Sequence, residues 1–155
     1  MIQTPSFYTY FGKTYRVEST PDGGLTGFLL NPRTGEFDEK PEHVREVMRA
    51  MASSDISKVP EEKFVQETER ARAYELKGAG AVFALYETID GLYEQARREN
   101  RRLAPQESAL IQSLRKRTFK MWEDELARRA AGEPPSFRAE PRFPEYRPPE
   151  EGASE

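Results

Sequence analysis

The sequence predicts an α+β fold in which strands come first and helices follow. Aromatic and β-branched runs separated by turn residues fill the first 38 positions, which is typical of short antiparallel strands. From Pro41 onward the apolar residues recur with the 3.6-residue period of helices. After residue 132 the chain has six prolines and few aliphatic side chains, a composition that predicts a disordered proline-rich tail.

These patterns divide the chain into three expected units. Residues 1–56 are expected to form a β-meander with a short helix, residues 57–131 a helical region with a hinge near 78–80, and residues 132–155 the disordered tail. At 155 residues the chain is close to the usual size of one domain.

The expected meander has three or four strands. The run 7–11 and the alternating run 14–18 flank Gly12-Lys13, which is expected to be a two-residue turn. A further extended run covers 25–30, and a turn at 31–35 leads into Glu36-Phe37. So small a sheet is marginally stable alone, so we expect a helix to cover it.

That covering helix is predicted after Pro41. A second helix begins near Pro60 and is interrupted at Gly78 and Gly80. The residues that form the apolar stripe of the first helix are Val44, Val47, Met48 and Met51.

Two longer helices follow, and the short connection between them predicts an antiparallel helical hairpin. The stripe of the first is Val82, Leu85, Tyr86, Ile89, Leu92, Tyr93 and Ala96. The second restarts at Ala104-Pro105, and its apolar residues are Leu110, Leu114, Phe119, Trp122 and Leu126.

The composition argues against an enzyme. The chain lacks cysteine, which excludes disulfides and thiolate chemistry and fits a cytoplasmic location. Its single histidine, His43, is expected on the outer face of a short helix, and no sequence motif supplies it with a catalytic partner. We therefore predict no cofactor and no metal. Since the chain has neither a signal-like start nor an apolar run long enough to span a bilayer, we predict no membrane contact.

The leading functional hypothesis is a non-enzymatic adaptor or assembly component. Spaced aromatic residues in the tail are typical of a docking peptide, and aromatic residues of the hairpin could be shared between its own packing and a partner. The candidate contact residues are Phe137, Arg138, Phe143, Tyr146 and Arg147 in the tail, and Tyr86, Tyr93 and Trp122 in the hairpin. The partner is another protein or complex, or a second copy of the chain.

A regulator or packaging factor that contacts nucleic acid is the first alternative. Residues 95–130 carry ten basic residues against five acidic ones, which is the charge that a phosphate backbone requires. The residues of this candidate patch are Arg97, Arg98, Arg101, Arg102, Arg115, Lys116, Arg117 and Lys120. The formal net charge of −3 and a pI of about 5.5 weigh against it. An inhibitor or immunity-type protein is the second alternative.

Overall fold

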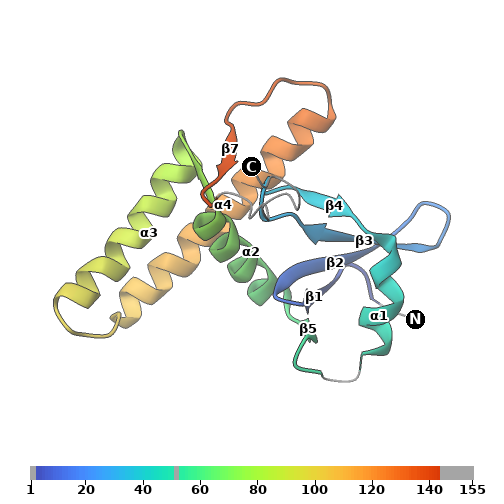
Figure 1. The fold of residues 1–155 in the computed structure, drawn as a ribbon, viewed down its shortest axis with the longest axis horizontal. Helices are drawn as coiled ribbons and strands as arrows, with labels where there is room; N and C mark the ends of the chain where they lie inside the picture. Colours follow the sequence, from blue (N-terminus) through green and yellow to red (C-terminus); the bar gives the residue numbers. More distant parts are fainter. Residues whose placement is uncertain (1–2, 51–52, 144–155) are drawn as a thin grey trace, which may run out of the picture.

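The computed structural model describes residues 3–50 and 53–143, and it begins with an antiparallel sheet that is followed by helices, as predicted (Figure 1). The sheet has five strands in the order β4-β3-β2-β1-β5. Their bounds are β1 Ser6–Tyr10, β2 Lys13–Ser19, β3 Leu25–Leu30, β4 Phe37–Glu39 and β5 Ile56–Val59. The α+β prediction is therefore confirmed.

The first turn differs from the prediction by one residue. Tyr10 pairs with Lys13, so the two turn residues are Phe11 and Gly12, with φ angles of 47° and 80°. A two-residue hairpin turn of this kind needs a positive φ at both positions, which glycine adopts at little cost. Phe11 adopts the positive φ here, and its side chain is exposed at the end of the hairpin.

Strand β5 was not predicted. Ile56–Val59 pairs antiparallel with β1, with Val59 opposite Phe7. Four residues between a serine-rich break and Pro60 resemble an interhelical loop, because a strand this short shows little alternation. The predicted boundary between residues 56 and 57 falls inside this strand.

A short helical segment covers one face of the sheet, as expected. It consists of the 3-10 turn η1 (Pro41–His43) and α1 (Val44–Arg49). Val47 is buried against Tyr8 and Tyr15. Met48 is partly exposed, and Met51 lies outside the described residues.

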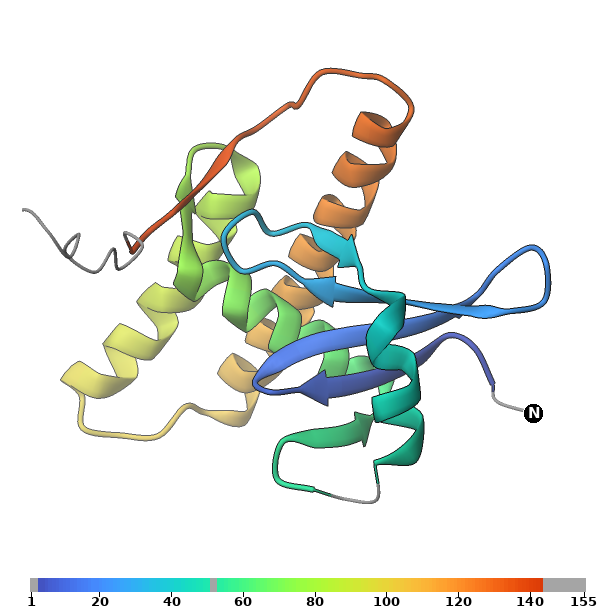
Figure 2. The same cartoon turned by 45° about the vertical axis from the view of Figure 1, so that its right-hand side comes forward.

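The opposite face of the sheet packs against α2 (Glu61–Glu75). Phe64 and Val65 of this helix contact Phe7 and Val59 of the sheet, and Phe119 joins the same cluster. The sheet and the helical region therefore share a hydrophobic core, and α2 lies between the sheet and the remaining helices (Figure 2).

Two long helices complete the body, α3 (Ala81–Arg98) and α4 (Pro105–Ala130). Figure 1 shows them joined by a short loop and diverging from it. In α3 the buried residues Val82, Tyr86, Ile89 and Ala96 belong to the predicted stripe, while Phe83 is buried outside it and Leu85, Leu92 and Tyr93 are only partly buried. In α4 they do not: Leu110 is 46% exposed, whereas Arg115, Thr118 and Glu125 are buried. Thr118 and Glu125 meet hydrogen-bonding partners inside the fold, and Arg115 lines a cavity, neither of which periodicity can reveal.

The predicted hinge near 78–80 is occupied by a paired strand. β6 (Leu76–Gly78) pairs with β7 (Ala139–Pro141) in a separate two-stranded sheet. A Cβ at Gly78 would lie 2.5 Å from the Phe83 ring, so the chain is tightly packed there. Gly80, with φ 117°, then leads into α3.

The prediction of a disordered tail is wrong for residues 132–143. The Phe137 ring packs edge-on against Trp122 at 4.9 Å between centroids, and Ser136 N donates to Glu125 Oε1 at 3.1 Å. These contacts and the pairing of β7 with β6 supply the burial that composition alone did not indicate. Residues 144–155 lie outside the described residues.

A buried polar network joins the sheet to all three long helices. Arg72 Nη1 donates to Glu69 Oε2 at 2.8 Å, and Arg72 Nε donates to the Gly35 carbonyl at 2.9 Å. Tyr86 Oη donates to Glu69 Oε1 at 2.8 Å and accepts from Trp122 Nε1 at 2.9 Å. Burial, and then the Glu69 carboxylate, raise the pKa of Tyr86, so its hydroxyl stays protonated as a donor.

We predict that Arg72→Met lowers the free energy of unfolding by about 3–5 kcal/mol, because it leaves the Glu69 carboxylate buried without its charge partner. Urea unfolding followed by circular dichroism measures this. Arg70→Gln is the control, since Arg70 is exposed and pairs with Glu67 at the surface, and we expect it to change stability by no more than about 0.5 kcal/mol. Equal stability of the two variants would contradict the prediction.

The Glu125 carboxylate accepts hydrogen bonds from Ser136, next to Phe137, and these bonds are strongest when the carboxylate is ionised. Burial works against the carboxylate, but the hydrogen bonds from Ser136 and the nearby Arg129 and Arg128 outweigh it, so the pKa of Glu125 is lower than usual. A lowered folded-state pKa means that the stabilisation is complete above the unfolded value of about 4.3 and is lost as the pH falls through the folded value.

We therefore expect acid to loosen the packing of Phe137 on Trp122, the only tryptophan of the chain. Trp122 fluorescence recorded against pH should show a transition below about pH 4 in the wild type. Glu125→Gln should show the loosened signal already at neutral pH, while Glu133→Gln, an exposed neighbour in the sequence, should match the wild type. Superimposable curves for Glu125→Gln and the wild type would refute this role.

Candidate functional site

A groove runs between α2 and the α3–α4 pair. It is formed by two adjoining cavities of about 380 and 390 Å³, which share Arg70, Tyr93 and Arg115 in their walls. Both volumes lie in the range of ligand-binding pockets. We call this surface the basic groove and define it by Lys63, Gln66, Arg70, Tyr93, Arg115 and Arg142.

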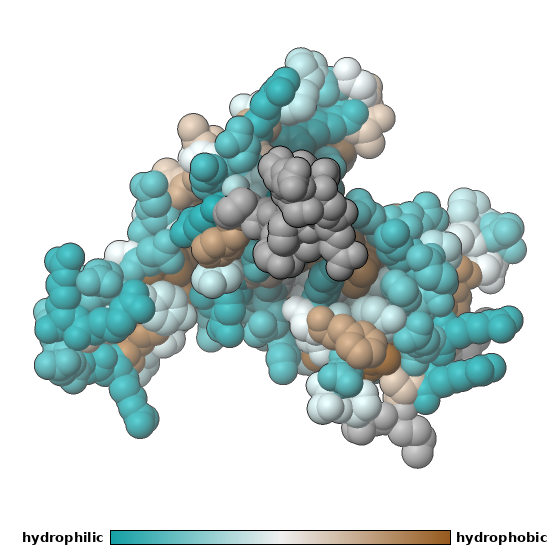
Figure 3. Space-filling model, in the orientation of Figure 1, coloured by the Kyte–Doolittle hydropathy of each residue, from teal (hydrophilic) through white to brown (hydrophobic). Residues whose placement is uncertain are grey.

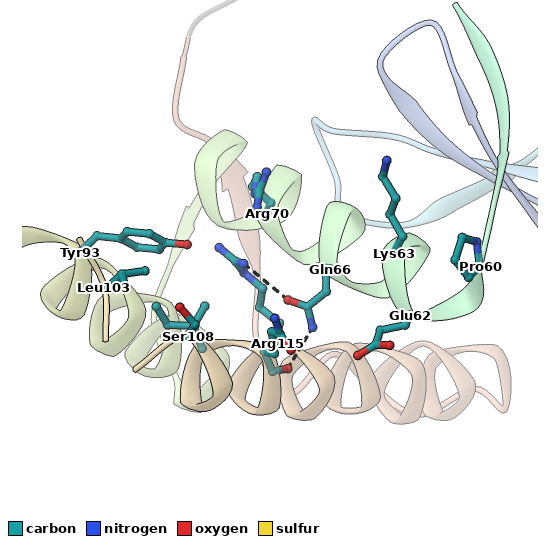
Figure 4. A pocket seen from close by; sticks show the side chains of 11 residues that line it. Pro60, Glu62, Lys63, Gln66, Arg70, Tyr93, Leu103, Ser108 and Arg115 are labelled. Atoms are coloured by element: carbon teal, nitrogen blue, oxygen red, sulfur yellow. Dashed lines mark hydrogen bonds between the residues drawn. The ribbon is translucent and has the colours of Figure 1, made fainter. Parts of the chain in front are cut away.

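Arg115 lies at the centre of the basic groove. Figure 4 shows its side chain rising from α4 into the space between Arg70 and the Tyr93 ring. Only 8% of the residue is exposed. Among the described residues its guanidinium has one hydrogen-bond partner, Gln66 Oε1 at 3.4 Å, and no carboxylate. A buried arginine usually has an anionic partner, so this one is available to a ligand.

The other basic side chains lie along the same groove. Arg70 is exposed and pairs with Glu67 at 3.5 Å, and Arg142 Nη2 donates to the carbonyls of Ala73 and Leu76 at 3.3 Å each. Lys63 is exposed at the other end. Since peptide carbonyls carry no net charge, Arg142 keeps its full positive charge at the groove.

Acidic residues also line the groove. Glu62 and Asp90 are exposed on its walls, and the buried Glu69 also lines it but is paired with Arg72. The groove is therefore positive at its centre and mixed in charge at its edge.

Apolar and aromatic groups complete the site. Pro60, Leu103 and Ile111 line the cavity next to Arg115. Near Arg142, Tyr74 is 63% exposed and lies 5.2 Å from the ring of Phe143, which is 44% exposed. We call Tyr74 and Phe143 the aromatic pair. Most of the face seen in Figure 3 is hydrophilic, with hydrophobic residues in small separate patches.

The predicted aromatic contact residues are divided between the core and the surface. Tyr86 and Trp122 are buried in the polar network, where a partner cannot contact them. Tyr93 is half-buried and lines the groove, and Phe143 belongs to the aromatic pair. Phe137 packs inward against Trp122, and Arg138 is exposed beside it. Tyr146 and Arg147 lie outside the described residues.

The residues of the predicted nucleic-acid patch do not form one surface of free positive charge. Arg97 and Arg98 both pair with Glu94, and Arg101 pairs with Glu99 and Glu107. Further along, Lys116 lies 4.0 Å from Glu62, and Lys120 lies 3.4 Å from Asp124.

Three arginines of that patch differ from the rest. Arg102 and Arg117 are exposed and have no ion pair with any described residue, and Arg115 is buried in the groove. The alternative that this patch contacts nucleic acid stays a prediction.

Several groove residues were not predicted from the sequence. Lys63, Gln66, Arg70 and Tyr74 lie on α2, whose apolar residues are too scattered to show which face is buried. Arg142 follows a strand that was expected to be disordered. The one signal in the sequence for this site was a charged residue, Arg115, on the same face of α4 as the apolar residues Ile111 and Trp122.

His43 stacks on the Tyr10 ring at 4.5 Å, and its Nδ1 lies 3.7 Å from Glu46 Oε1. Within residues 3–50 and 53–143, no three histidine or acidic side chains gather as metal ligands would. In the same part of the chain, none of the helices has the length and hydropathy required to cross a bilayer.

Comparison with known proteins assigns the chain to no group. No protein-family model, no curated protein sequence and no solved structure matches it.

Proposed function

We propose that the chain is a non-enzymatic adaptor or assembly component that binds a partner protein over the basic groove and the aromatic pair. The observation that carries this proposal is the gathering of three arginines and three aromatic residues on one surface. These residues are Arg70, Arg115, Arg142, Tyr74, Tyr93 and Phe143.

This composition favours a protein partner. Arginine and tyrosine are enriched among the residues that contribute most to binding energy in protein interfaces. The aromatic pair is exposed enough to fill a pocket on a partner, and the adjoining groove can accept a projecting segment of that partner.

The contact with a partner is expected to depend on the aromatic pair. Replacing both rings, Tyr74→Ala with Phe143→Ala, should weaken binding by about 30-fold or more, because an aromatic side chain at the centre of an interface contributes about 2 kcal/mol or more. Affinity purification of the tagged chain from cells that express it, followed by quantitative mass spectrometry, measures the loss.

Met48→Ala is the matched control, because Met48 is a partly exposed apolar residue of α1, which covers the face of the sheet opposite to α2 and the aromatic pair. The control should retain every partner that the wild type recovers. The proposal fails if the double variant recovers the same proteins as the wild type. Loss of the partner on nuclease treatment would favour the nucleic-acid alternative instead, and a captured enzyme that the chain blocks would favour the inhibitor alternative.

A further inference from the structure

Arg115 presents a feature that the packing of the fold does not explain. Its guanidinium carries five N–H donors, yet among the described residues it donates one hydrogen bond, to the amide oxygen of Gln66 at 3.4 Å. Only 8% of the residue is exposed, yet the guanidinium nitrogens without a bond to a described residue are not enclosed in the core but open onto the groove, where a ligand can reach them. Such an arrangement is expected where a ligand supplies the missing anion.

The surrounding residues hold the side chain in position. Gln66 Nε2 donates to the Gln112 carbonyl at 2.9 Å, which directs Gln66 Oε1 towards Arg115. Figure 4 shows both of these hydrogen bonds, and it shows the Tyr93 ring extending into the groove towards the same guanidinium. Its burial in the groove wall and the hydrogen bond to Gln66 restrict the Arg115 side chain before any ligand arrives, which reduces the entropy lost on binding.

The walls beside Arg115 indicate what accompanies the anion. Leu103, Ile111 and Pro60 line the cavity that contains Arg115, so an apolar side chain fits next to the charge. Arg70 lines both cavities and can contact a second anionic group. The site thus suits an acidic residue that is followed by an apolar one.

We propose that the basic groove binds an acidic segment of the partner protein, with a carboxylate on Arg115 and an adjacent apolar side chain against Leu103 and Ile111. The planar guanidinium offers two parallel N–H donors, and this geometry matches a carboxylate. The proposal rests on the proposed function, to which it adds the chemistry of the bound segment.

The edge of the groove favours a protein segment over a nucleic acid. A phosphate backbone places a charge at every nucleotide, and the exposed Glu62 and Asp90 would repel it. A protein segment can place a basic or neutral residue opposite these acids. Beyond the groove, the exposed Arg97, Arg98 and Arg101 are already paired with glutamates, so a continuous basic track is missing among the described residues.

Fluorescence anisotropy with the purified full chain tests the proposal. The probes are a labelled peptide with a Glu-Leu-Glu triplet between Gly-Ser flanks, the same peptide with Gln-Leu-Gln, and labelled oligothymidine. We expect the Glu-Leu-Glu peptide to bind at least about tenfold more tightly than the Gln-Leu-Gln peptide, since a hydrogen-bonded charge contributes about 1.5–3 kcal/mol. Oligothymidine is expected to bind more weakly than the acidic peptide.

Three substitutions locate the site. Arg115→Gln should weaken binding of the acidic peptide about tenfold or more, and Arg70→Gln, which removes an exposed side chain and spares the core, should weaken it several-fold. Arg117→Gln is the matched control, because Arg117 is an exposed arginine of α4 whose side chain does not line either cavity. It should bind as the wild type does.

Equal binding of the acidic and glutamine peptides would overturn the proposal, as would equal losses in Arg70→Gln and Arg117→Gln. Tighter binding of oligothymidine than of the acidic peptide, dependent on Arg115, would replace it with a nucleic-acid site. If the peptides fail and the aromatic-pair variant still loses its partner, the proposed function stands and only the chemistry of the groove is wrong. If the peptides bind as expected but the aromatic-pair variant keeps its partner, the groove chemistry stands and the proposed role of the aromatic pair is wrong.

Discussion

The ion pair between Glu69 and Arg72 determines how the parts of this molecule fit together. Both side chains are fully buried on α2, and each also contacts a different element: Arg72 donates to the Gly35 carbonyl beside the sheet, and Glu69 accepts from Tyr86 of α3. Arg72 Nη2 is buried without a hydrogen-bond partner among the described residues, so the cost of burying the two charges is offset by the other bonds of the pair, which hold only while the sheet, α2 and α3 keep one relative position. Trp122 joins α4 to this network through its hydrogen bond to Tyr86 and through the packing of its ring on the Arg72 guanidinium, at 4.6 Å.

Gly35 is required at this junction, because its φ is 80° and a Cβ there would lie 2.6 Å from the Trp122 ring.

The groove follows from this junction. The polar network joins α2 to α3 and α4 near Tyr86 and Trp122, and one cavity lies beside Tyr86 while the other extends along α2 to Pro60. Arg115 lies on the same buried face of α4 as Trp122 but faces the groove, where Gln66 is its one described hydrogen-bond partner. A charge that the fold directs into a groove and leaves without an anion is well placed to select a partner by its chemistry.

The sequence predicted the elements of the fold better than their environment. The order of strands and helices, the stripe of α3 and the start of α4 at Pro105 were predictable, because local periodicity and turn chemistry determine them. Strand β5 and the pairing of β7 with β6 were not, because both depend on partners distant in the sequence. The same holds for the site. Tyr93, Arg115 and Phe143 were among the predicted contact residues, although Arg115 was assigned to a surface patch. The sequence did not indicate Arg70, Tyr74 and Arg142, because only the tertiary fold brings these residues next to Arg115.

The central claim is that Arg115 recognises a carboxylate of a partner, and a double-mutant cycle tests it most directly. The cycle compares the wild type and Arg115→Gln, each with the acidic peptide and with its glutamine counterpart, and it isolates the interaction between the two groups. The account predicts a coupling free energy of about 1.5 kcal/mol or more, with Arg115→Gln nearly unable to distinguish the two peptides. A coupling free energy near zero, with the preference for the acidic peptide intact in Arg115→Gln, would contradict it.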